Sequence, residues 1–383
     1  MNASTALPRR KPAGWAHPIK TMMLLKLLFI VWLLSMVSCT SPPVVELQPE
    51  TVGLIRANVA QNPPLNVSVI VFSRGVSDGG KAFGEKVFSP VRSAEADYLP
   101  FALRETLVES GHWGAVRVVP EQDPTAEVLV TAEIVLSNGV ELKLHVRVSD
   151  STGRVWVDQE YTDSAIDHGY DFDIKNLVEP FQDIFNKISN DMYVVRSGLG
   201  EMELAQILDT AMLRYAIALS PKAFAGHLAE TSSGVSQVTG LPARDDAIYA
   251  RAKKIRESEY TYIDTVDEQF ENFHKKMQLA YAYWRRYSFE LIEYSKKIEQ
   301  AGSLRARSQK GSWTSMEKVY RTYRESKMNE DSLREMAASF DAEISPTVTE
   351  LEGTVVRLNG SLRAQYIEWR RLLREIYAAE RES

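Results

Sequence analysis

Few side chains in this sequence have the types and spacing that catalysis requires. The histidines are scattered, and no two of them have the His-x-x-x-His spacing of a helical metal site. No Gly-x-Ser-x-Gly motif is present either. A hydrolase site would have to be assembled from dispersed residues, for which Glu105, His112 and Asp150 are the candidates. We therefore expect a non-enzymatic protein and keep an envelope hydrolase as the alternative.

An acidic segment in the middle of the chain is the best candidate for binding a cation. Asp163, Asp167, Asp171 and Asp173, together with His168, have the ligand density that Ca²⁺ prefers. The Asp-x-Asp-x-Asp-Gly order of a calcium loop is absent, and most acidic loops are solvated surface. We predict no bound metal and no cofactor, with Asp167, Asp171 and Asp173 as the residues to examine for a cation site.

The only cysteine, Cys39, directly follows a segment typical of export. Five Lys or Arg and no acid occur in residues 1–26, and residues 27–37 are apolar. A basic stretch, a short apolar run and a small residue before the cleavage site form the pattern of a secretory signal. An anchor helix that is not cleaved and starts near Met22 is the alternative, but a span needs roughly 20 apolar residues. We predict a signal peptide over residues 1–38, with translation starting at Met1 or near Met22.

The residues around Cys39, LLSMVSC over positions 33–39, resemble the lipobox of bacterial lipoproteins. Met36 departs from the usual Leu, whereas Ser38 is an accepted small residue. The resemblance implies that Cys39 is lipidated, with palmitate among the chains, and becomes the first residue of the mature protein. In such lipoproteins a residue other than Asp after the cysteine implies the outer membrane, and Thr40 fits this. The expected location is the outer membrane, facing the periplasm.

Composition excludes several classes of partner. The formal charge is −6, and the cationic leader makes the remaining chain more acidic still. This argues against nucleic acid as a partner and against broad adhesion to anionic lipid. A single cysteine excludes an intramolecular disulfide and a thiolate metal cage. Prolines at positions 42, 43, 63 and 64 indicate that residues 39–64 form a tether beyond the lipid.

Residues 65–175 are predicted to form a small α+β domain. A strand over residues 66–72, a helix over 94–110 and a strand over 115–119 precede three strands over 126–136, 141–149 and 154–162. Asn138-Gly139 is a strong hairpin signal, and residues 150–153 mark a second turn. Leu142 and Leu144 alternate with Lys143 and His145, as expected for a sheet with one buried face. The expected topology is β-α-β followed by a three-stranded meander.

Two stretches of this domain and one near the carboxyl end carry a family resemblance. Residues 98–107 (YLPFALRETL), 110–120 (SGHWGAVRVVP) and 365–377 (QYIEWRRLLREIY) resemble an uncharacterised lipoprotein family of Gram-negative bacteria. The amino-terminal part is also loosely similar to the small α+β domain of TolB-like envelope proteins. Both resemblances imply an envelope setting and a binding role.

The rest of the chain is predicted to be mainly helical. After a helical connector over residues 176–262, apolar residues recur at steps of three and four from Ile263 to Ile298, and less regularly from Met316 through Tyr323 to Ile344. Joined by a polar turn, the two runs predict a long antiparallel helical hairpin over residues 263–345. A coiled coil between copies of the chain is the alternative.

The turn of this hairpin contains Arg305, Arg307 and Lys310. A charge at the centre of a bilayer costs several kcal/mol, so we do not expect this turn to enter a membrane. A contact with phosphate or an acidic partner is the functional interpretation, and simple solvation is the alternative.

Residues 346–383 are predicted to form a short strand or hairpin and an amphipathic helix over 362–380. Trp-Arg-Arg occurs at positions 284–286 and again at 369–371, which predicts a buried Trp flanked by exposed Arg side chains. Together these features predict an α+β protein, anchored by lipid in the cell envelope, that binds or scaffolds an envelope protein partner.

Overall fold

The computed structural model describes residues 51–58, 63–75, 89–165, 179–300, 313–342, 347–351 and 354–382. The chain divides into two compact units, Met1–Glu50 and Thr51–Ser383, and all described residues belong to the second. Among these residues, no helix combines the length and the apolar character that crossing a membrane requires.

A five-stranded sheet in the order β2-β1-β3-β4-β5 forms the amino-terminal half of this unit. β1 (Val67–Ile70) pairs in parallel with both β2 (Val116–Val119) and β3 (Val128–Ser137). β3, β4 (Glu141–Asp150) and β5 (Val155–Ser164) form an antiparallel meander. With α2 (Ser89–Ser110) between β1 and β2, the predicted β-α-β order and meander are confirmed.

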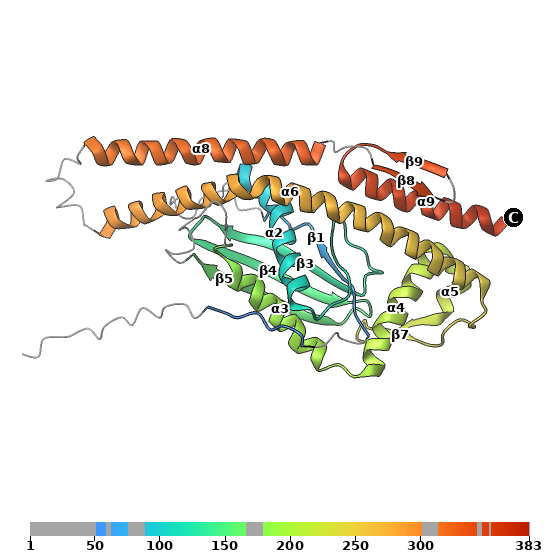
Figure 1. The fold of residues 1–383 in the computed structure, drawn as a ribbon. Coiled ribbons are helices and arrows are strands. Elements are labelled where there is room, and N and C mark those ends of the chain that lie inside the picture. Colours follow the sequence, from blue (N-terminus) through green and yellow to red (C-terminus); the bar gives the residue numbers. More distant parts are fainter. Residues whose placement is uncertain are drawn as a thin grey trace, which may run out of the picture. The chain divides into compact units, whose positions relative to one another are not determined.

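The two faces of the sheet differ as the alternating pattern predicts. Leu142, Leu144, Val146 and Val148 of β4 are buried under α2 and α3 (Gln182–Ser197), which lie across one face (Figure 1). On the opposite face, His145 forms a hydrogen bond and Arg147 an ion pair with Asp158 of β5. The sheet therefore has one face packed in the core and one polar face.

The segment between the sheet and the long helices is less uniformly helical than predicted. α4 (Glu201–Leu219), the short α5 (Pro221–Phe224) and a 3₁₀ turn (Ala225–His227) lead into a two-stranded hairpin of β6 (Leu228–Glu230) and β7 (Ser236–Val238). The next helix, α6 (Ala247–Gln300), begins well before Ile263. Asp246 accepts a hydrogen bond from the Tyr249 backbone at 2.9 Å and caps this helix.

The long helices form the predicted antiparallel hairpin (Figure 1). Phe273 of α6 stacks on Phe340 near the carboxyl end of α8 (Trp313–Ala342), with 4.2 Å between ring centroids. Further along α6, Tyr287 bonds Glu325, which lies earlier in α8. The predicted seam of α6 is buried at Val266, Phe270, Phe273, Met277, Trp284 and Leu291, whereas its member Tyr294 is 38% exposed.

The seam of α8 differs from the predicted one at Tyr323, which is 46% exposed. Counting back from buried Leu333 in steps of three and four leads to Glu330, Ser326 and Thr322, all of which are buried. Because Leu333 and Ala337 pack in the same core as α2 and the sheet, they fix the rotation of α8 and turn Tyr323 outward.

The carboxyl end is the predicted hairpin and amphipathic helix. β8 (Thr347–Leu351) pairs with β9 (Thr354–Leu358), and α9 (Leu362–Glu382) follows. Trp369 of α9 stacks on Tyr262 of α6 with 4.8 Å between ring centroids. This contact closes a second core, which includes α4, α6 and α9.

Candidate functional site

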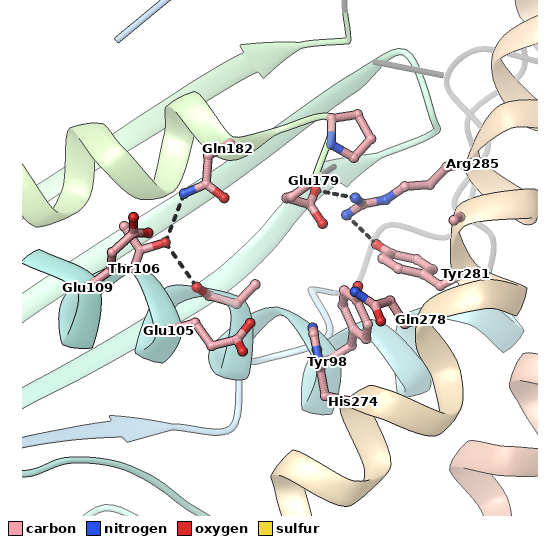
Figure 2. Close-up of a pocket in the computed structure, with 13 residues that line it drawn as sticks. Tyr98, Glu105, Thr106, Glu109, Glu179, Gln182, His274, Gln278, Tyr281 and Arg285 are labelled. Carbon is pink, nitrogen blue, oxygen red and sulfur yellow. Dashed lines mark hydrogen bonds and ion pairs between the residues drawn. The ribbon is translucent and has the colours of Figure 1, made fainter. Parts of the chain in front are cut away.

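A cavity of about 330 Å³ lies between α2, the turn before α3, and α6 (Figure 2). Its volume is at the lower end of the range of small-molecule sites, which is about 300–1,000 Å³. Polar side chains provide most of its lining: Tyr98, Glu105, Thr106, Glu109, Glu179, Gln182, His274, Gln278, Tyr281 and Arg285.

Helical periodicity brings these side chains together. On α2, Tyr98, Glu105 and Glu109 are separated by seven and four residues, which places them on one face of the helix. His274, Tyr281 and Arg285 repeat the same spacing on α6. Two helices that pack with these faces toward each other form opposite walls of one cavity, and Glu179 closes its end (Figure 2).

A chain of buried polar contacts supports the wall formed by α6. Arg285 donates to Glu179 and, at 2.8 Å, to the hydroxyl of Tyr281. The Tyr281 hydroxyl in turn donates to Glu95 of α2 at 2.7 Å, and Ser137 at the end of β3 donates to the same oxygen. Because each of these groups is partnered, the network links α6, α2 and the sheet without leaving its charges uncompensated.

The prediction that both arginines of each Trp-Arg-Arg motif are exposed is wrong for the first arginine. The Arg285 side chain is only 1% exposed, and its guanidinium lies over the ring of Tyr281, 4.0 Å from the centroid. Arg370 is half-buried and bonds Glu259 at 3.0 Å. In each motif a carboxylate from a distant part of the sequence compensates the guanidinium of the first arginine.

His274 and Tyr98 form a stacked pair on the inner wall. Their ring centroids are 4.1 Å apart with 24° between the planes. Burial and the positive charge of Arg285 lower the pKa of His274 to about 4. The imidazole is therefore neutral at pH 7 and adds no positive charge to the cavity. The sequence signal at this position is the spacing of Glu271 and His274, three residues apart on a helix.

Glu105 is exposed, and it is the carboxylate of the cavity without an ion pair among the described residues. Glu179 is bound by Arg285, and Glu109 pairs with Arg56 at 2.5 Å on the surface. Burial raises the pKa of Glu105, and the nearby Glu271 and Glu109 raise it further, whereas Arg104 and Lys275 oppose the shift. A carboxylate in this state favours a cationic neighbour.

The lining does not contain the elements of a nucleophilic site. The hydroxyl of Thr106 donates to the Ala102 carbonyl at 3.1 Å and accepts from Gln182 at 2.9 Å, so no base is positioned to activate it.

The dispersed residues of the alternative hydrolase are not brought together. Glu105 lines the cavity, but His112 donates through Nε2 to the Ile55 carbonyl at 3.0 Å and stacks on Tyr193. Asp150 accepts from Trp156 at 2.8 Å and from Thr152, which stabilises the turn before β5. Each of the last two has a structural role.

Of the acidic segment, the structure describes Asp163. Its carboxylate accepts hydrogen bonds from the backbones of Ser164 and Ile184, at 2.9 and 3.2 Å, and so holds the start of α3. Asp167, His168, Asp171 and Asp173 lie outside the described residues, as do Cys39, Arg305, Arg307 and Lys310. Within the described part of the chain, no three His, Cys, Asp or Glu residues are grouped to hold a metal ion.

The outer face of α8 is a second candidate surface, here called the α8 face. It consists of Tyr320, Arg321, Tyr323, Arg324, Lys327 and Met328, which are all exposed. At 3.6 residues per turn these six side chains cover about 160° of the helix circumference. Tyr320 and Met328 are 67% and 62% exposed, so the described part of the chain leaves these large side chains uncovered.

No protein-family model matches this chain, and no curated protein is significantly similar to it. The cavity and the α8 face therefore have to be interpreted from their own chemistry.

Proposed function

We propose that this chain is a lipid-anchored protein of the cell envelope that binds another envelope protein and catalyses no reaction. The proposal of an anchor rests on the basic and apolar leader before Cys39 and on the lipobox-like residues around it. The outer membrane, with the folded part facing the periplasm, is the proposed location because Thr40 follows the cysteine. Two or more lipid chains would make such anchoring stable.

The α8 face is the observation that carries the binding role. Arg321 and Arg324 form no ion pair among the described residues, although the chain as a whole is acidic. Tyr320 and Tyr323 lie beside these cations on the same surface. Tyr and Arg are the side chains most enriched at the energetic centres of protein interfaces. An exposed surface that combines them fits a partner protein with an acidic face.

The rest of the hairpin gives this surface a firm support. Trp284 and Leu291 of α6 are buried, and Leu333 and Ala337 of α8 pack into the same core as α2. A binding surface on a braced helix loses little conformational entropy when the partner docks. The function is thus a scaffold that presents the α8 face at the end of a lipid tether.

Affinity purification from detergent-solubilised envelopes tests this proposal. We compare the wild-type chain with the double variant Arg321→Glu/Arg324→Glu, and with Lys222→Glu/Arg244→Glu as a control of equal charge change at exposed positions. The wild type and the control should co-purify the same envelope protein in equal amounts. The α8 variant should recover at least about tenfold less of it, as expected for like-charge repulsion at an interface. Equal recovery with the α8 variant would contradict the proposal.

A further inference from the structure

The cavity between α2 and α6 contains polar groups that the fold itself does not satisfy. Tyr98 and His274 are 4% and 6% exposed, and both line the cavity (Figure 2). Among the described residues, the Tyr98 hydroxyl and the His274 ring nitrogens have no hydrogen-bond partner, although the two rings stack on each other. These polar atoms are not among the fully buried atoms without a partner, so they reach the space of the cavity and are available for hydrogen bonds with an occupant.

The charges of the cavity select the kind of occupant. Arg285 is neutralised by Glu179, and Glu109 by Arg56, which leaves Glu105 as the carboxylate without a partner in the described chain. His274 is neutral, and the cations near Glu105 in the described chain are paired elsewhere, Arg104 with Asp267 and Lys275 with Glu271. An anion would meet Glu105 without compensation, whereas a cation would form a charge-assisted hydrogen bond with it.

The arrangement of these groups also restricts the shape of the occupant. Glu105 lies seven residues after Tyr98 on the same face of α2, two helical turns or about 10 Å along the axis. An occupant that reaches both must carry its ammonium group at one end and a hydrogen-bonding group at the other. Gln278, which lines the cavity beside His274, offers an amide for that second group (Figure 2).

From these observations we infer that the cavity is a binding site for a small organic amine, held by an ion pair with Glu105 and by hydrogen bonds to Tyr98 and His274. Arg285 and Tyr281 position the wall of α6 and do not bind the amine directly, because their donors are used by Glu179 and Glu95. This site is separate from the α8 face, so either proposal can fail without the other.

Isothermal titration calorimetry with 1,4-diaminobutane as the probe tests this inference on the purified chain. Butyrate, which has a similar carbon chain and the opposite charge, serves as the control ligand. Three variants are compared: Glu105→Gln, Tyr98→Phe and, as a control for loss of an exposed carboxylate, Glu268→Gln on α6. Circular dichroism of each variant establishes that it is folded.

The wild type should bind 1,4-diaminobutane and not butyrate. Glu105→Gln should weaken binding at least about tenfold, as expected for the loss of one charge-assisted hydrogen bond. Tyr98→Phe should weaken it by a smaller factor, and Glu268→Gln should leave it unchanged. Binding should also decrease as the pH falls and Glu105 becomes protonated. No detectable binding to the wild type, equal binding of butyrate, or equal affinity in the folded Glu105→Gln variant would overturn the inference.

Discussion

Gly139 lies against the backbone of Arg285. A Cβ atom added at Gly139, in the turn between β3 and β4, would come within 2.6 Å of the Arg285 carbonyl oxygen and 3.1 Å of the Phe289 nitrogen. The backbone of Gly139 also has a φ of +86°, which residues other than glycine rarely adopt. The hairpin that the sequence marks by Asn138-Gly139 is thus also the place where the sheet meets α6.

Replacing Gly139 by alanine should therefore cost more than replacing a glycine that has only an unusual φ. We expect Gly139→Ala to lower the free energy of unfolding by about 3 kcal/mol, through the left-handed backbone and the overlap with α6. Gly360→Ala is the control, because Gly360 has a φ of +97° but its nearest atom would be 3.4 Å away. It should cost about 1 kcal/mol. If urea denaturation gave equal losses in the free energy of unfolding for both variants, the close contact between Gly139 and α6 would not contribute to stability.

Arg285 and Arg286 are neighbours in sequence with different roles. Arg285 is buried with Glu179, whereas Arg286 is half-exposed and 3.3 Å from Glu290. Removing one partner of a buried ion pair leaves an uncompensated charge, so Arg285→Ala should destabilise the fold by about 3–5 kcal/mol. Arg286→Ala should change stability by no more than about 0.5 kcal/mol. Thermal and urea unfolding of the two variants measure this difference, and similar losses in both would contradict it.

Local patterns in the sequence predict most of the secondary-structure elements of this chain. The alternation of Leu142 and Leu144 with Lys143 and His145 predicts both β4 and its buried face. The regular spacing from Val266 to Leu291 likewise predicts α6 and its seam. Such patterns depend on neighbours within a few residues, which is why the β-α-β order, the meander and the helical hairpin could all be predicted.

The cavity depends on contacts between distant parts of the chain, and these could not be predicted. Arg285 is buried because Glu179 and the Phe181 ring, more than a hundred residues earlier, lie against it. Nothing in the local Trp-Arg-Arg motif indicates this. The outward rotation of Tyr323 is a similar case, since Leu333 and Ala337 set it by packing on another element. The Glu-x-x-His spacing of Glu271 and His274 could have indicated one residue of the cavity, but it was not recognised in the sequence.

The buried imidazole of His274 should make the fold sensitive to acid. Its pKa is about 4 in the folded chain and 6.5 in an exposed histidine, so between these values the unfolded chain binds a proton that the folded chain does not. Stability from this group is present above pH 6.5 and is lost as the pH falls toward 4. At about 1.4 kcal/mol per unit, the loss is on the order of 3 kcal/mol.

Urea unfolding at several pH values tests this dependence. His274→Phe keeps an aromatic ring beside Tyr98 and Phe101 but cannot be protonated. It should lose less stability than the wild type between pH 6.5 and 4, and His227→Phe, which replaces a half-buried histidine outside the cavity, serves as the control. Parallel pH profiles for the wild type and His274→Phe would contradict the account.

Lipidation gives a prediction for the amino-terminal unit. Cells that express the chain and are supplied with labelled palmitate should incorporate the label into the wild type and not into Cys39→Ala, because Cys39 is the only thiol in the sequence. A second variant, Ser38→Ala, keeps a small residue before the cysteine and should be labelled normally. Label that persists in Cys39→Ala would rule out the proposed anchor.

The most direct test of the binding role places a photo-crosslinking amino acid, p-benzoylphenylalanine, at Tyr320 in living cells. Tyr320 is the most exposed aromatic residue of the α8 face, and Met202 on α4, which is even more accessible at 87% exposed, provides the control position. We predict one discrete crosslinked protein from position 320, its loss when Arg321→Glu and Arg324→Glu are added, and no such product from position 202. The absence of a discrete product from position 320, or the same product from position 202, would contradict the proposal that this chain is an envelope scaffold acting through the α8 face.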